Sequence, residues 1–165
     1  MRAMIEPTQQ PDAAPDFVWP VRVYYEDTDT GGVVYYANYL KFFERARTEW
    51  LRACGVDQRR VADETGAIFV VCDAALNYRA PARLDDALTI TCKIDRLGHA
   101  SVTFTQQAWR DDMLLVTAKV RIACVDRTVF RSSLIPPPVF EALKRGPAAR
   151  GLRGGGVNAE RPGAV

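Results

Sequence analysis

A continuous apolar stripe between residues 39 and 54 restricts how this chain can fold more than any other feature. Apolar side chains recur there at i, i+4, i+7, i+11 and i+15, which is the spacing of one face of an α-helix. They are Tyr39, Phe43, Ala46, Trp50 and Cys54, and the opposite face carries Lys41, Arg45, Thr48 and Arg52. Asn38 is predicted as the N-cap, and Gly55 as the residue just past the helix.

Strand-like stretches lie on both sides of this helix. The first is "FVWPVRVYYEDT", with Val21, Val23 and Tyr25 predicted on one face. Four more follow at residues 67–80, 86–97, 100–110 and 113–126, and their separators are turn-like and compatible with antiparallel hairpins. Short helices are expected at 57–65 and 136–145. The order predicts an α+β fold, with an antiparallel sheet of about five strands around one long central helix.

Length and composition favour one soluble domain. Residues 16–145 are predicted to form it, between disordered tails at 1–15 and 146–165 that are rich in Pro, Ala, Gln, Gly and Arg. A net charge of +2 argues against nucleic acid as a general partner. No apolar run approaches the roughly 20 residues of a membrane span, and the start lacks a signal-peptide core, so a cytoplasmic location without membrane insertion is expected.

The cysteines and the histidine disfavour a metal centre. Cys54, Cys72, Cys92 and Cys124 form no CxxC pair and are predicted to be small buried thiols. A structural zinc site would also call for histidines, and His99 is the only one in the chain. A structural metal site is therefore not expected.

An acidic segment links the first strand to the helix. It follows the pattern D-x-D-x-x-G-V-V-Y-x-x-N-Y from Asp27 to Tyr39, and "YRAPARLDDALTI" lies downstream. These motifs resemble the 4-hydroxybenzoyl-CoA thioesterase family, and most closely its branch associated with the Tol-Pal envelope system. The resemblance covers roughly residues 17–140 in strand order and length. It implies a hotdog fold, acyl-CoA thioesterase activity, and subunits that pair as a homodimer or a homotetramer (a dimer of dimers) to complete the active sites.

The resemblance also implies roles for single residues. Asp29 matches the family's catalytic carboxylate, and the backbone N–H of Tyr36 matches the donor that polarises the thioester carbonyl. Hydrolysis requires a carboxylate to attack or to activate water, and donors for the oxygen that gains charge. The adjacent Gly31 and Gly32 allow a sharp bend between them. Asp27 is expected to hydrogen-bond backbone N–H groups of the loop.

The branch usually carries histidine where this chain has Tyr36. A role of the backbone N–H survives that exchange, whereas a role as an imidazole acid or base does not. Substrate-binding positions implied by the resemblance are Gly32, Val33 and Asn38 in the motif, Ile68, Phe69 and Val70 from a second subunit's strand, and Arg96 and His99 for the nucleotide of CoA. Arg79 and Arg83 are weaker basic candidates.

Other readings of the hotdog fold compete with the thioesterase. A dehydratase would require a histidine at the helix, and His99 lies on a strand-like segment instead. A non-catalytic acyl-CoA-binding protein or scaffold in envelope or lipid metabolism would not need Asp29. An acyl-carrier-protein thioesterase would differ only in the carrier, so lipid-synthesis or acyl-carrier partners stay open. The interpretation that the sequence favours is a cytoplasmic acyl-CoA thioesterase. This enzyme would need no metal and no cofactor, since coenzyme A enters only as part of the substrate.

Overall fold

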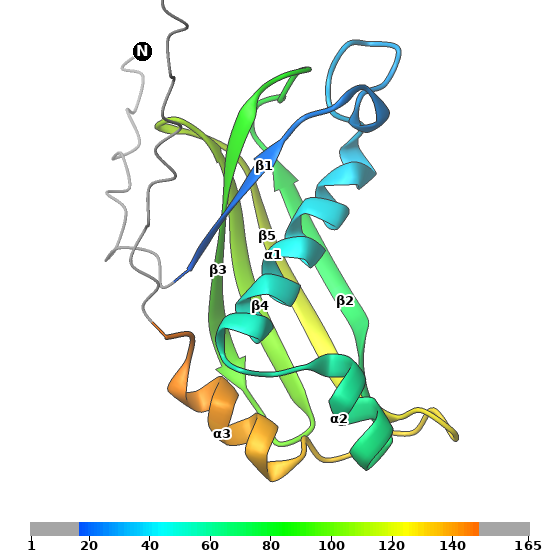
Figure 1. Ribbon diagram of the computed structural model, residues 1–165. Helices are drawn as coiled ribbons and strands as arrows, with labels where there is room; N and C mark the ends of the chain where they lie inside the picture. Colours follow the sequence, from blue (N-terminus) through cyan, green and yellow to red (C-terminus); the bar gives the residue numbers. More distant parts are fainter. Residues whose placement is uncertain (1–16, 149–165) are drawn as a thin grey trace, which may run out of the picture.

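The computed structural model describes residues 17–148 (Figure 1). The predicted tail at 1–15 and all but the first three residues of the predicted tail at 146–165 lie outside the described residues. The elements are β1 (Val18–Arg22), the 3-10 turns η1 (Tyr25–Asp27) and η2 (Tyr36–Asn38), α1 (Tyr39–Ala53), α2 (Gln58–Thr65), β2 (Ala67–Tyr78), β3 (Ala87–Leu97), β4 (Ser101–Arg110), β5 (Met113–Asp126) and α3 (Pro137–Arg145).

One antiparallel sheet in the order β1-β3-β4-β5-β2 curves around α1 (Figure 1). This arrangement confirms the predicted α+β hotdog architecture. The separators after β3 and β4 form the expected hairpins, but β2 and β3 do not pair, and β2 joins the far edge beside β5. The reason is that residues 79–86 pass the beginning of α1, where the Ala82 N–H donates to the Tyr39 hydroxyl at 3.1 Å.

The predicted apolar stripe of α1 is buried along its whole length. All five of its side chains are at most 8% exposed, and Phe42 and Phe43 are fully buried. Trp50 meets Phe104 of β4 edge to face, with ring centroids 5.5 Å apart. Gly55 follows the helix with φ of +82°, a left-handed conformation that glycine adopts without steric cost. The helix therefore fills the concave side of the sheet.

The first strand is shorter than predicted. β1 ends at Arg22, and the chain then turns through η1. Val21 and Val23 are buried as expected, but Tyr25 is 81% exposed because the two-residue alternation stops before it. Cys72 was likewise expected to be buried, but it is exposed, because it lies on the edge strand β2 at the register shift between Val71 and Asp73. Among the described residues, none of the helices is both long and apolar enough to span a membrane.

Truncating the centre of the helix should destabilise the domain strongly. Phe43→Ala removes a fully buried ring, and we expect the free energy of unfolding to fall by about 3–5 kcal/mol because a cavity is left under α1. Urea denaturation followed by circular dichroism measures this change. Leu40→Ala is the matched control, since Leu40 lies on the same helix and is 41% exposed. An equal loss of stability in both variants would contradict this account of the core.

Candidate active site

The two aspartates of the acidic segment have different surroundings. Asp27 is 3% exposed, and its carboxylate accepts the Tyr24 N–H at 2.8 Å and the Asn38 Nδ2–H at 2.5 Å. Its carbonyl accepts the Tyr35 N–H at 2.9 Å. The predicted structural role of Asp27 is therefore confirmed. It ties the end of β1 to the beginning of the helix.

Asn38 occupies the N-cap position but does not cap the helix. Its side chain makes no hydrogen bond to the first turn of α1, and its own backbone is helical, with φ of −71° and ψ of −22°. The predicted capping bond is wrong because η2 runs directly into α1 and because the buried Asp27 carboxylate takes the Asn38 amide. The helical path accordingly begins at Tyr36, two residues earlier than the N-cap position.

Asp29 lies at the tip of a tight, exposed loop. Its Oδ1 accepts the Gly31 N–H at 2.8 Å, its carbonyl accepts the Gly32 N–H at 3.0 Å, and its N–H donates to the Val33 carbonyl at 2.9 Å. Gly32 has φ of +76°, and a Cβ on Gly31 would lie 3.1 Å from the Asp29 carboxylate. Both glycines thus permit the bend that the sequence predicted.

A ladder of backbone contacts holds the two arms of this loop together. Thr28 pairs with Val34, and Val33 pairs with Arg83 from the segment that leads into β3. Asp29 lies on the first arm, and Tyr36 follows the second. No hydrogen bond among the described residues joins Asp29 to Tyr36. The Tyr36 N–H has no hydrogen-bond partner among the described residues. An exposed carboxylate and an open donor at a helix entrance therefore belong to one braced loop.

An open hollow of about 290 Å³ lies beside the helix entrance. It is lined by Val34, Tyr36, Tyr39, Tyr78, Arg79, Ala80 and Pro81. The Tyr78 hydroxyl donates to the Tyr36 carbonyl at 2.8 Å, which fixes the end of β2 against η2. Burial raises the pKa of Tyr78 and that of Tyr39, so both phenols stay protonated at neutral pH. The hollow is an aromatic surface that could receive an apolar group.

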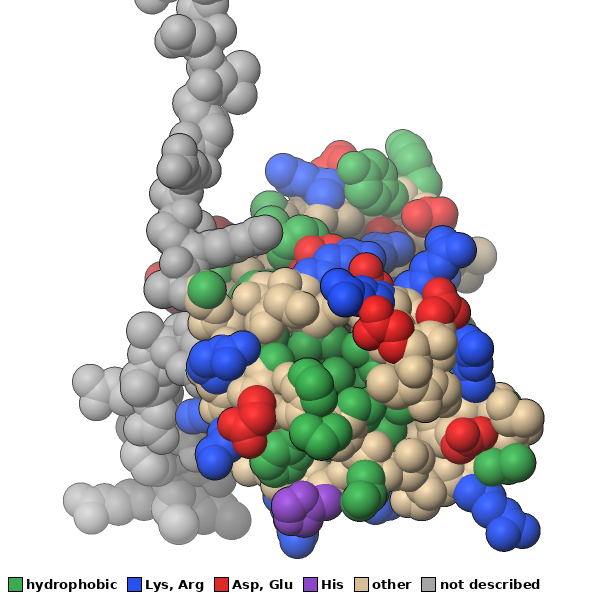
Figure 2. All heavy atoms as spheres, turned by 60° about the horizontal axis from the view of Figure 1, so that its bottom comes forward, with side chains coloured by type: hydrophobic (Ala, Val, Ile, Leu, Met, Phe, Trp, Pro, Cys, Tyr) green, Lys and Arg blue, Asp and Glu red, His purple; other side chains and the backbone are tan. Residues whose placement is uncertain are grey.

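Among the basic candidates, Arg79 lies at this hollow. Arg96 belongs to the last residues of β3, and His99 lies in the turn that follows this strand. Figure 1 shows that β3 ends at the other end of the sheet, near α3 and the C-terminal end of α1. The His99 ring stacks on Phe140 of α3, with centroids 5.3 Å apart. Figure 2, which brings that end forward, shows Lys and Arg side chains scattered among Asp and Glu rather than gathered in one patch.

Ile68, Phe69 and Val70 are half-buried at the beginning of β2, also far along the sheet from Asp29 within one chain. Gly32, Val33 and Asn38, in contrast, belong to the loop and the helix entrance. Tyr78 and Pro81 were missed as site residues. The signal that could have found them is the downstream stretch "YRAPARLDDALTI", which begins with Tyr78 and returns to the helix entrance.

Comparison with known proteins identifies the family. The model of the Thioesterase superfamily matches residues 31–117. The chain belongs to this superfamily. The acyl-CoA thioesterase YbgC of Haemophilus influenzae is 44% identical over 127 residues, which cover 77% of this chain and 93% of that protein. The acyl-CoA thioester hydrolase YbgC of Escherichia coli is 45% identical over 130 residues, covering 78% and 96%.

Solved structures agree with this assignment. A probable thioesterase from Bartonella henselae is 39% identical and superposes with a TM-score of 0.68, covering 72% of this chain and 98% of that one. The chain is therefore a thioesterase with the hotdog fold, and the predicted family is confirmed.

Exchanging each aspartate of the loop for asparagine should separate its structural from its chemical contribution. Asp27→Asn places an amide donor among two N–H donors in a buried site, so we expect unfolding free energy to fall by about 1–3 kcal/mol. Asp29→Asn changes an exposed group, and we expect it to lower the free energy of unfolding by less than about 0.5 kcal/mol. Parallel urea titrations measure both. A larger loss for Asp29→Asn than for Asp27→Asn would refute the roles given to the two carboxylates.

Proposed function

We propose that this thioesterase hydrolyses acyl-CoA thioesters to a free acid and CoA, with Asp29 as the catalytic carboxylate. The observation that carries the proposal is the braced loop, which presents the exposed Asp29 carboxylate and leads into Tyr36. The Tyr36 N–H has no hydrogen-bond partner among the described residues, and its ring lines an open aromatic hollow. The curated relatives from Haemophilus influenzae and Escherichia coli bear the same activity in their names.

The chemistry follows from the two groups. The Asp29 carboxylate either attacks the thioester carbonyl carbon or takes a proton from the water that does so. The carbonyl oxygen gains negative charge, and the Tyr36 N–H at the positive end of the helix dipole stabilises that charge. The C–S bond then breaks, CoA leaves as the thiolate, and the acyl group becomes a carboxylic acid. If the Asp29 carboxylate attacks directly, an anhydride between the acyl group and Asp29 forms as an intermediate. Water then hydrolyses this anhydride to the free acid and restores Asp29.

Tyr36 contributes through its main chain in this scheme. Its side chain is 63% exposed and contacts Tyr35 and Tyr78, with ring centroids at 4.9 and 6.3 Å. The backbone N–H keeps its direction whatever the side chain is, so tyrosine in place of histidine leaves the polarising donor intact. The ring instead forms one wall of the hollow.

Replacing Asp29 tests the proposal directly. Asp29→Asn preserves shape but removes the charged oxygen, and we expect kcat/KM to fall by about 10²–10⁴-fold with unchanged folding. A panel of aliphatic and aromatic acyl-CoA thioesters, assayed with wild type and variant side by side, measures this loss and ranks the substrates. Acyl groups on acyl carrier protein complete the panel. Near-normal turnover by Asp29→Asn would refute the catalytic role of Asp29. A wild type that hydrolyses none of these thioesters would instead favour a non-catalytic acyl-CoA-binding role.

We further propose that two copies pair through the outer edges of β2. This strand ends the sheet, so its outer N–H and C=O groups have no neighbouring strand among the described residues. Val71 and Tyr78 expose 54% and 46% of their surface along it. In an antiparallel pair, Phe69 and Val70 of one copy would approach the Tyr78 end of the other. That pairing explains how residues distant from Asp29 within one chain could line its site.

The same pairing would turn the end of the sheet that carries Arg96 and His99 toward the partner's loop, where both could hold CoA phosphates. Because arginine and histidine cations attract phosphate oxygens, we keep this nucleotide-binding role as part of the proposal. A dimer of dimers, a cytoplasmic location and a connection with the Tol-Pal envelope system stay predictions drawn from the sequence resemblance.

A charge on the β2 edge should disrupt both association and activity. Val71→Glu would place like charges near each other across a pair of β2 strands, and we expect a shift to monomers together with loss of hydrolysis. Light scattering after size-exclusion chromatography measures the mass. Thr105→Glu is the control, because Thr105 is exposed in the central strand β4. Full activity in a monomeric Val71→Glu protein would contradict a site shared between copies.

A further inference from the structure

Arg47 is a buried cation that the proposed hydrolysis does not use. It lies on α1, turns toward the sheet and is only 5% exposed. Among the described residues, no Asp or Glu oxygen lies within 4.0 Å of it. Its Nη1 donates to the Gln106 side-chain oxygen at 2.8 Å. Gln106 is fully buried on β4 and donates in turn to the Phe43 carbonyl at 3.0 Å, so this neutral partner is held in place.

A buried guanidinium with one neutral partner is electrostatically incomplete. Removing a charge from water is costly unless a counter-charge and further hydrogen bonds replace the lost hydration. Burial lowers the pKa of Arg47, which is the expected sign of this cost. Glu44 stands one turn away, but its carboxylate is exposed and accepts the Thr48 hydroxyl at 2.7 Å instead. Among the described residues, no carboxylate therefore forms an ion pair with Arg47, and Glu44 acts on its charge only from a longer distance.

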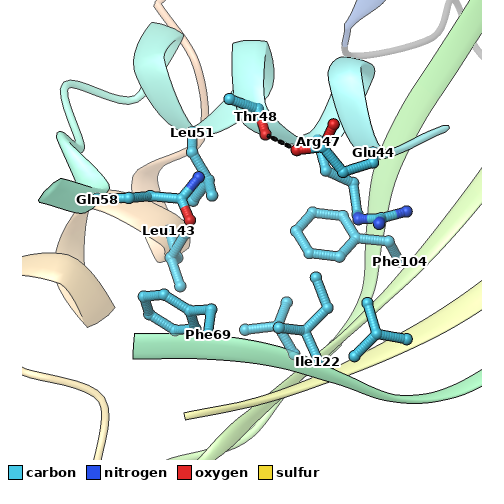
Figure 3. Close-up of a pocket in the computed structure, with 11 residues that line it drawn as sticks. Glu44, Arg47, Thr48, Leu51, Gln58, Phe69, Phe104, Ile122 and Leu143 are labelled. Carbon is cyan, nitrogen blue, oxygen red and sulfur yellow. Dashed lines mark hydrogen bonds between the residues drawn. The ribbon is translucent and has the colours of Figure 1, made fainter. Parts of the chain in front are cut away.

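A cavity of about 100 Å³ has Arg47 among its lining residues, and Figure 3 shows the Arg47 side chain reaching from α1 to the ring of Phe104, which also lines the cavity. It lies between α1 and the concave face of the sheet, and α3 contributes Leu143 to its wall. The apolar lining is Leu51, Phe69, Val71, Val102, Phe104, Ile122 and Leu143. Polar groups are supplied by Arg47, Glu44, Thr48 and Gln58, and Glu44 and Thr48 lie together on α1 (Figure 3). A mostly apolar, partly open cavity therefore has one buried cation, Arg47, and one exposed acidic residue, Glu44, in its wall.

We propose that this cavity binds a small carboxylate anion, with the carboxylate against Arg47 and a short apolar tail among the surrounding side chains. The planar guanidinium has five N–H donors that match a carboxylate in a forked arrangement, and Gln106 takes only one of them among the described contacts. A volume of about 100 Å³ equals the space of roughly three water molecules, which suits an acid of about the size of propionate or butyrate.

The bound anion has two chemical sources. A short free acid is the class of product that thioester hydrolysis releases, and a carboxylate at the far end of an acyl chain presents the same group. Both links rest on the proposed function. Binding at Arg47 itself does not, because it needs neither Asp29 nor turnover.

Titration of the full chain with butyrate, followed by ligand-observed NMR, tests the site. We expect saturable binding with a Kd on the order of millimolar, because so few atoms make contact. Butyramide, which has a similar shape but no charge, should bind at least about tenfold more weakly. Arg47→Met should weaken butyrate binding by a similar factor, whereas Arg45→Met on the exposed face of the same helix should leave it unchanged.

Three results would overturn the inference: no saturable binding by wild type, equal binding of butyramide, or unaltered butyrate affinity in Arg47→Met. Wild type would show no saturable binding if an acidic side chain of a second copy neutralised Arg47. Should Arg47→Met fail to fold, Gln106→Glu replaces it, because it sets a permanent carboxylate beside the guanidinium at nearly unchanged volume. Butyrate binding should be lost in that variant too, and its retention would equally refute the site.

The KM values for two thioesters, measured with wild type and Arg47→Met, then distinguish the two possible sources of the anion. If Arg47→Met raises KM for glutaryl-CoA but not for butyryl-CoA, the anion belongs to the substrate. If both KM values stay unchanged while butyrate binding is lost, the ligand is a free acid. Either outcome supports the anion site. If wild type hydrolyses no thioester at all, the proposed function fails, and the butyrate titration still decides the role of Arg47.

Discussion

Burial of α1 inside the curved sheet is the interaction on which the rest of the structure depends. One face of the helix is covered by β1, β3, β4 and β5, so the sheet has to bend around it. Large rings such as Phe42 and Phe43 fill the space, and each contributes roughly 1.5–3 kcal/mol when removed from water. Because the sheet follows the helix, both ends of α1 become fixed points to which loops are attached.

The N-terminal end of α1 connects this core to the chemistry. Asp27 and Asn38 are buried polar groups that satisfy each other, and their bond fixes the chain entering the helix relative to the chain leaving β1. The loop that carries Asp29 is closed above this bond by short backbone pairings. An exposed carboxylate on a rigid base loses little order when a substrate binds, which is what the catalytic role proposed for Asp29 would require.

Local features were predictable because local chemistry specifies them. The helical stripe, the glycine bend and the structural role of Asp27 follow from spacing and turn preferences within a few residues. The strand partner of β2 and the exposure of Tyr25 did not follow, because pairing depends on where segments distant in sequence meet. Arg47 was missed because an arginine next to an apolar stripe is usually a solvated side chain.

By itself, the sequence determined that one amphipathic helix must be covered by strands, and that an acidic, glycine-containing loop precedes it. Those properties are encoded in periodicity and in residue types that favour a single backbone conformation. Only the tertiary structure decided which side chains share an environment. It set Tyr78 against Tyr36, and it enclosed Arg47 with Gln106 beside an apolar cavity. Such contacts join residues tens of positions apart, and their surroundings exist only after the sheet has closed around α1.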